Sequence, residues 1–179
     1  MVLFVFLKVV QWTDEAQLRC LKEAYEIICE DDMDASIAAA VCYRINNNAV
    51  EFLLVRTKGG KYWTFPKGHI ENDLLESPWA AAQREAGEEA GVKGTIETEL
   101  LTNYLYRKRD NEDDDLIAAY LMCVEPEEQP CEDGRDPQWF TPVLAMKKLA
   151  KRRSKKYVRE HHRVICKAMC KLNEHGLSK

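Results

Sequence analysis

The stretch Arg84-Glu85-Ala86-Gly87-Glu88-Glu89-Ala90-Gly91-Val92 decides the fold of this chain and the chemistry expected of it. On a helix, Glu85, Glu88 and Glu89 stand at positions i, i+3 and i+4, so they share one face with Cβ atoms about 5–6 Å apart. Like charges at this spacing weaken an isolated helix. Mg²⁺ would offset the repulsion, because it binds carboxylate oxygens and keeps several waters. Taken alone, the trio also fits a solvated acidic helix face.

The flanking residues predict a helix over 77–90. Ser77 is placed as the N-cap, Pro78 suits the first helical position, and Gly91 is typical of a C-terminal stop. We expect the Ser77 cap to contribute roughly 1 kcal/mol to stability.

Residues upstream of the helix complete a longer pattern. Gly68 follows Trp63-Thr-Phe-Pro-Lys67, and Glu76 lies eight residues before Arg84. With the Arg-Glu, Glu-Glu, glycine and aliphatic positions of the stretch quoted above, these residues resemble the signature of the Nudix superfamily. Two departures stand out. Seven residues instead of five separate Gly68 from Glu76, which predicts a two-residue loop insertion, and the aliphatic position after Arg-Glu is only Ala86.

The resemblance covers roughly residues 35–172. Within that superfamily, the sequence over residues 88–94 and 137–140 most resembles the diadenosine polyphosphate and diphosphoinositol polyphosphate hydrolases. The resemblance implies an α+β Nudix fold with a mixed β-sheet between helices. It also implies a site for Mg²⁺, or alternatively Mn²⁺. Glu85, Glu88 and Glu89 would be both catalytic and metal-binding, Arg84 would be catalytic, and Gly68 would bind the metal.

Hydrophobic patterning predicts strands and helices without regular β–α–β alternation, which favours an α+β class. The expected strands cover 36–45, 50–57, 62–65, 92–107 with an interruption, 116–124 and 138–140; further helices cover part of 14–30, 143–150 and 154–172. The acidic stretch 125–136 is expected to be a solvated loop. The domain organisation follows: an N-terminal extension with one helix (1–34), a Nudix domain ending in a helical pair (35–172) and a tail (173–179).

Basic and aromatic side chains near the signature are candidates for substrate binding. They are Arg56, Lys58, Lys61, Trp63, Lys67, Arg107, Arg109 and Phe140. Each cation also fits a surface charge, and each ring also fits burial in the sheet. The acidic residues 112–115 are a pool for a general base or a solvated hairpin loop. The basic run over 147–171 attracts a highly phosphorylated ligand or RNA, or serves as a soluble helix face.

Composition limits the setting in which the chain works. It has 179 residues, a net charge of -4 and seven cysteines without paired C-x-x-C spacing, which favours a reducing, cytoplasmic location. Residues 1–10 are apolar but too few to span a bilayer, which takes about 20, so no membrane association is expected. Cys166 and Cys170 lie near His161 and His162, where buried thiols are favoured over a metal site.

Three classes of function follow from these features. The first is hydrolysis of a phosphoanhydride in a small molecule, such as a diadenosine or diphosphoinositol polyphosphate. The second is removal of pyrophosphate from RNA 5′ ends or from nucleoside triphosphates. The third is a Nudix module that binds a ligand or RNA without catalysis, and the intact Glu85, Glu88 and Glu89 speak against it. The sequence does not indicate which oligomeric state the protein adopts.

Overall fold

The computed structural model describes residues 35–71, 75–106, 114–174 and 176, so the helix predicted within residues 1–34 and the basic residues Arg107 and Arg109 lie outside the described residues. The strands are β1 (Ile37–Asn46), β2 (Ala49–Arg56), β3 (Trp63–Thr64), β4 (Lys67–His69), β5 (Val92–Ile96), β6 (Thr102–Tyr106), β7 (Asp115–Glu128) and β8 (Gln138–Phe140). The helices are α2 (Pro78–Ala90), α3 (Pro142–Ala150) and α4 (Lys155–Glu174).

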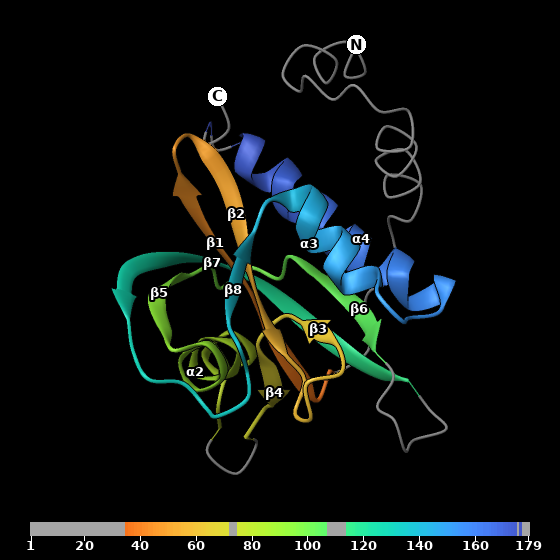
Figure 1. The fold of residues 1–179 in the computed structure, drawn as a ribbon. Helices are drawn as coiled ribbons and strands as arrows, with labels where there is room; N and C mark the ends of the chain where they lie inside the picture. The colour runs from red at the N-terminus through yellow and green to blue at the C-terminus, as the bar shows by residue number, and fades with distance from the viewer. Residues whose placement is uncertain (1–34, 72–74, 107–113, 175, 177–179) are drawn as a thin grey trace.

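The sheet is mixed and lies between helices, as predicted (Figure 1). Its main order is β3-β2-β1-β7-β5, with β4 paired to β1, β6 to β7 and β8 to β2. Strand β1 runs parallel to β7 and antiparallel to β2. Helix α2 covers one face, and α3 with α4 covers the other.

Strand β1 explains why so many of its residues are apolar. Ala39 and Val41 belong to the core that α3 and α4 cover, whereas Ala38 and Ala40 belong to the core under α2. Successive side chains of a strand point to opposite faces, so a strand buried on both sides has no polar alternation. The predicted turn after this strand is confirmed, because Asn47 and Asn48 adopt positive φ angles of 49° and 61° between paired β1 and β2.

Two strand predictions need correction. Strand β7 continues to Glu128, so the first part of the predicted loop over 125–136 is wrong; Val92 of β5 pairs with Glu128 and holds this extension in the sheet. Strand β4 was not expected from the sequence. It is only three residues long, and its pairing of Gly68 with Ala38 of β1 involves residues distant in the chain.

Helix α2 begins and ends at the predicted residues, but the expected side-chain cap at its start is absent. Gly91 has a left-handed φ of 64°, and its N–H donates to the Gly87 carbonyl at 3.0 Å. A side chain at Gly91 would place its Cβ 2.0 Å from the Gln129 carbonyl oxygen. Ser77 stands at the N-cap before Pro78, yet its side chain makes no capping hydrogen bond. The contribution expected from that cap is therefore corrected: proline at the first position, and not the hydroxyl, favours the start of this helix.

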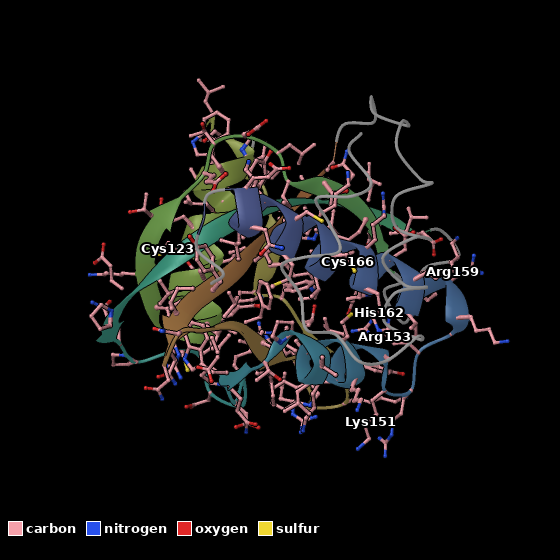
Figure 2. All side chains as sticks on the ribbon, turned by 90° about the horizontal axis from the view of Figure 1, so that it is seen from above. Cys123, Lys151, Arg153, Arg159, His162 and Cys166 are labelled. Atoms are coloured by element: carbon pink, nitrogen blue, oxygen red, sulfur yellow. The ribbon has the colours of Figure 1, made fainter. Side chains whose placement is uncertain are left out.

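The histidine and cysteine group of α4 is a packed core feature. His161 is fully buried, 6.2 Å from Phe65 and 5.3 Å from Tyr104 between ring centroids. Its Nδ1 lies 2.7 Å from the Tyr157 carbonyl oxygen, and His162 Nε2 lies 3.1 Å from that of Met146. Figure 2 labels His162 with the neighbouring Cys166. Within the described part of the chain no such group is arranged to hold a metal.

The buried imidazole makes the fold sensitive to acid. Because its Nδ1–H must donate to a carbonyl, Nε2 is the bare nitrogen, and it has no partner among the described residues. Burial lowers the pKa of His161 from 6.5 to about 3. Between these two values the unfolded chain binds a proton that the folded chain does not, so stability is full above pH 6.5 and falls as pH drops.

We expect this histidine to remove up to about 1.4 kcal/mol of unfolding free energy for each pH unit below its unfolded pKa. Denaturant unfolding of the wild type and of His161→Phe, measured from neutral pH downward, checks this. The phenylalanine keeps a ring between Phe65 and Tyr104 and should flatten the dependence. An unchanged dependence in His161→Phe would contradict the assignment.

Candidate active site

The three glutamates of α2 lie on the helix face next to β4, and each has a different environment. Glu89 is buried, Glu85 is half-buried, and the Glu88 side chain is 50% exposed. The predicted i, i+3, i+4 register is therefore confirmed as a shared helix face. The buried end of this face meets the backbone of β4, where Lys67 and Gly68 lie.

Gly68 makes room for the Glu85 carboxylate. A Cβ built on Gly68 would lie 1.9 Å from Glu85 Oε1, which no real structure tolerates. The glycine is thus required for close approach of a helix carboxylate to strand backbone. Desolvation by burial raises the pKa of Glu85, and the charge of Glu88 acts in the same direction, whereas the hydrogen bond from Arg84 lowers it.

Glu89 is held from both sides. The Lys67 backbone N–H donates to its Oε2 at 3.1 Å, and Arg135 Nη2 lies 2.7 Å from its Oε1. Burial raises the pKa of Glu89 to about 7, although the nearby charges of Lys67 and Arg135 oppose that rise. These contacts fix the carboxylate at the inner end of the acidic face.

Arg84 organises the outer end of the same face. Its guanidinium forms a two-pronged pair with Glu76, at 2.9 and 3.1 Å, and reaches Glu85 at 2.8 Å and Glu88 at 3.2 Å. It also donates to the His69 carbonyl at 3.0 Å. Bidentate guanidinium–carboxylate pairs fix geometry well. Glu76 therefore acts on the site through Arg84. Part of the segment with the predicted two-residue insertion, residues 72–74, lies outside the described residues.

The donor set fits a hard divalent cation. All three side chains offer carboxylate oxygens, and Glu85 raises the pKa of Glu89 by its charge, a repulsion that a cation between them would relieve. Within the described residues no group of three acids already converges as a metal site, because Arg84 and Arg135 occupy the carboxylates. The residues that would hold the ion are Glu85, Glu88 and Glu89.

A group of cations, of which the sequence singled out only Lys67, stands at the inner end of the acidic face: Lys67 and Arg135 act on Glu89, and Arg153 acts on Lys67. Arg135 is 12% exposed, and the Lys67 ammonium lies 4.6 Å from the centre of the Tyr106 ring. Arg153 Nη2 donates to the Trp63 carbonyl at 2.7 Å, and its Nε is buried without a partner among the described residues. We name Lys67, Arg135 and Arg153 the cation wall. Burial lowers the pKa of Lys67, which Glu89 counteracts.

Sequence signals for the cation wall were weak. Arg135 belongs to a stretch interpreted only as an acidic loop, and Arg153 was one of many residues in a basic run. Both reach the site through folding over long distances in the sequence: Arg135 lies 2.7 Å from Glu89, and Arg153 lies 5.3 Å from the Tyr106 ring centre. Lys67 is the member that the motif itself indicated.

Several predicted substrate-binding residues lie elsewhere. Trp63 and Phe140 are buried, only 3% and 8% exposed, and pack edge to face at 5.2 Å. The Arg56 guanidinium covers the Trp63 ring at 3.9 Å. The expectation that these rings stack on a base is therefore corrected, since they fill the core instead. Lys58 and Lys61 are exposed in the turn after β2.

Asp114, from the acidic pool considered for a general base, is bound instead by Tyr157 and Lys156 of α4. This fixes its carboxylate against the helix. Glu112 and Asp113 of the same pool lie outside the described residues. Among the described residues, Glu85, Glu88 and Glu89 share the helix face beside β4.

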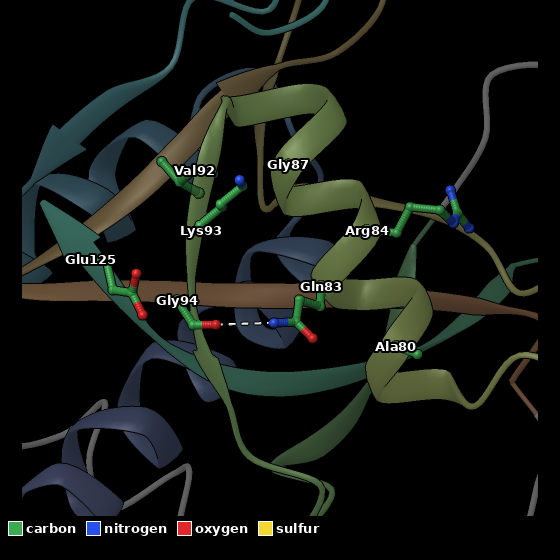
Figure 3. Close-up of a pocket in the computed structure, with 8 residues that line it drawn as sticks. All are labelled: Ala80, Gln83, Arg84, Gly87, Val92, Lys93, Gly94 and Glu125. Carbon is green, nitrogen blue, oxygen red and sulfur yellow. Dashed lines mark hydrogen bonds between the residues drawn. The ribbon is translucent and has the colours of Figure 1, made fainter. Parts of the chain in front are cut away.

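A hollow lies along α2 and β5. Ala80, Gln83 and Gly87 line it from the helix, and Gln83 Nε2 donates to the Gly94 carbonyl at 3.0 Å (Figure 3). Arg84 also lines the hollow, but its side chain points away from β5. The hollow therefore adjoins the acidic face at Arg84.

Comparison with known proteins agrees with this geometry. A family model described as NUDIX domain matches residues 35–161. The chain is 31% identical to Nudix hydrolase 16, mitochondrial, of Arabidopsis thaliana over 104 residues, which cover 54% of this chain and 56% of that protein. It is 30% identical to diphosphoinositol polyphosphate phosphohydrolase 2 of Rattus norvegicus over 112 residues, covering 63% of this chain and 61% of that protein.

A shorter match joins the chain to bis(5'-nucleosyl)-tetraphosphatase (asymmetrical) of Sus scrofa, 46% identical over 50 residues, with 27% of this chain and 33% of that protein covered. These matches span less than two thirds of each relative. Among solved structures, a C. elegans Ap4A hydrolase superposes with a TM-score of 0.62 at 24% identity, covering 78% of this chain and 99% of that one. That likeness shows the fold.

Proposed function

This chain belongs to the Nudix family, and from that premise we propose that it hydrolyses a phosphoanhydride bond with a divalent cation held by Glu85, Glu88 and Glu89. The observation that carries the proposal is the place of the Glu85 carboxylate, 1.9 Å from where a Cβ on Gly68 would stand. That close approach brings the acidic face against β4.

The side chains divide the work of the reaction between them. Mg²⁺, when bound, would neutralise phosphate oxygens and activate a water. Arg84 keeps Glu85 and Glu88 oriented through its contacts at 2.8 and 3.2 Å. The cation wall faces the inner end of the site, where its positive charges would hold the anionic oxygens of a substrate and of the departing phosphate.

The proposed substrate carries several linked phosphates, in a diadenosine polyphosphate or a diphosphoinositol polyphosphate. Two observations support this class. Lys67 and Arg135 act on Glu89, and Arg153 acts on Lys67, so three cations gather at the inner end of the site; relatives named for such substrates also match the chain. The proposed cytoplasmic location is supported by the described cysteines, all of which are free thiols. None of the described helices is both long and apolar enough to cross a membrane.

A substrate screen tests the proposed function. The protein would be incubated with diadenosine polyphosphates, diphosphoinositol polyphosphates and nucleoside triphosphates, with Mg²⁺ or Mn²⁺, and the products identified. We expect cleavage of anhydrides, no cleavage of phosphate monoesters, and loss of activity on chelation that Mg²⁺ restores. Absence of turnover on every anhydride would overturn the proposal.

Substrate charge gives a sharper prediction. A triple variant in which Arg107, Lys108 and Arg109 are each replaced by glutamine should have a raised KM. The increase should be larger for a substrate with many phosphates than for a nucleoside triphosphate. More anionic oxygens need more fixed cations, and exposed contacts are modest and screened by salt. Steady-state kinetics at two salt concentrations measure the difference, with Lys93→Gln on β5 as a control. Equal losses for both substrates would remove the reason to prefer a polyphosphate.

A further inference from the structure

Cations that the active site does not use gather at one end of the α3–α4 pair. Residues 147–159 hold eight Lys or Arg and no Asp or Glu, although the whole chain has a net charge of -4. Five of these side chains are exposed and enter no ion pair within the described part of the chain. We name these five the basic belt: Lys147, Lys151, Arg152, Lys155 and Arg159.

The belt is a row and not a convergent pocket. Lys147 lies in the last turn of α3 and Lys151 follows that helix as its C-cap in extended backbone, whereas Lys155 and Arg159 are one helical turn apart at the start of α4. Arg152 links the two pairs with a left-handed φ of 63°. Cations in the first turn oppose the helix dipole, so Lys155 has no local structural benefit there. The row therefore fits a ligand with repeated negative charges.

The belt begins where the active site ends. Arg153 lies between Arg152 and Ser154 in the same connector, but it turns inward to the Trp63 carbonyl and Tyr106. Figure 2 shows Lys151 and Arg159 at the outer edge of the molecule, with Arg153 between them. A chain of phosphates with one end at the cation wall would thus meet the belt as it leaves.

We propose that the basic belt binds the phosphodiester backbone of an RNA strand whose 5′ phosphoanhydride end enters the active site. The assignment of the 5′ end rests on the proposed function; the binding of the backbone does not. The belt offers positive charge without exposed rings, so it would bind without reading sequence. A lipid surface fits less well, because α3 and α4 bury their apolar residues in the core and expose a single large one, Leu144, among those described.

Binding of RNA without hydrolysis tests the belt directly. The probe is a labelled single-stranded oligouridine with a 5′-hydroxyl, followed by fluorescence anisotropy over a salt series. The variant Lys151→Gln/Lys155→Gln is compared with Lys93→Gln/Lys167→Gln, which removes the same two charges from β5 and the middle of α4. We expect the belt variant to weaken binding on the order of tenfold and to reduce the salt slope by about 1.4, and the control to change neither.

Equal weakening by both double variants would show a response to net charge alone and overturn the belt. The proposal would also be overturned if the wild type bound no oligouridine, or if it bound vesicles containing phosphatidylserine in place of RNA. Thermal melting of each variant shows whether it is folded.

Turnover separates this proposal from the proposed function. With RNA carrying a 5′-triphosphate, the belt variant should raise KM, whereas KM for free GTP should stay as in the wild type. Lack of hydrolysis of any anhydride, with the binding result intact, would refute the proposed function and leave the belt standing. Hydrolysis of GTP with no effect of the belt variant on RNA would refute the belt alone.

Discussion

Replacing Glu88 by glutamine is expected to remove nearly all turnover while the fold stays intact. The Glu88 side chain is 50% exposed, and its ion pair is the i,i+4 contact with Arg84 at 3.2 Å. Such surface pairs contribute about 0.5 kcal/mol or less. The amide keeps the volume but loses the charge that a cation needs. If that charge supplies roughly 3 kcal/mol to the transition state, the rate falls about 100-fold.

The measurement is kcat at saturating metal and substrate, with thermal melting beside it. A matched control is Glu51→Gln on β2, because Glu51 also pairs with an arginine, Arg44, at 2.8 Å. That variant removes an equivalent charge away from α2 and should leave turnover unchanged. Near-normal turnover in Glu88→Gln would refute its place in the metal site.

The structure changes the expectation for the neighbouring glutamate. Glu89→Gln should also abolish turnover, but the buried Glu89 is bound by Arg135 and by the Lys67 N–H, so this variant loses an internal charge pair. Breaking such a pair costs stability, on the order of 1–3 kcal/mol. Helical spacing does not distinguish Glu88 from Glu89, because burial depends on what the rest of the chain places over the helix.

The parts of the site that follow from local rules were predictable. Helical spacing put the three glutamates on one face, and Gly91 ended the helix, since both depend on residues within a few positions of each other. The resemblance to the Nudix signature implied that Gly68 and Glu85 belong to one metal site, but not that they are in contact. The structure supplies the physical reason for that contact, the space that a missing Cβ leaves.

The parts that depend on distant segments were not predictable. Arg135 reaches Glu89 from a loop after β7, and Arg153 arrives from the connector between α3 and α4. Nothing in a basic or acidic run says which of its side chains turns inward. Trp63 and Phe140 gave the opposite error: aromatic residues near a motif suggested a base platform, but pairing of β2 with β3 and β8 places them in the core.

Replacing Gly68 by alanine should therefore damage catalysis far more than folding. The added Cβ would lie 1.9 Å from Glu85 Oε1, so the carboxylate must move. Because the obstructing atoms are the end of a flexible side chain, the shift costs little stability, but it displaces a proposed metal ligand. We expect a loss of turnover on the order of 100-fold, as for a missing ligand charge, with a melting temperature close to that of the wild type.

Gly87→Ala makes the same chemical change on α2 and provides the control. A Cβ on Gly87 would have the Val92 carbonyl oxygen as its nearest atom, at an ordinary 3.9 Å, and alanine favours a helix interior by about 1 kcal/mol over glycine. That variant should keep its turnover and gain stability. If Gly68→Ala retains normal kcat and metal dependence, the carboxylate of Glu85 is not needed where the structure places it. If it instead melts as a misfolded protein while Gly87→Ala does not, Gly68 serves the sheet more than the site.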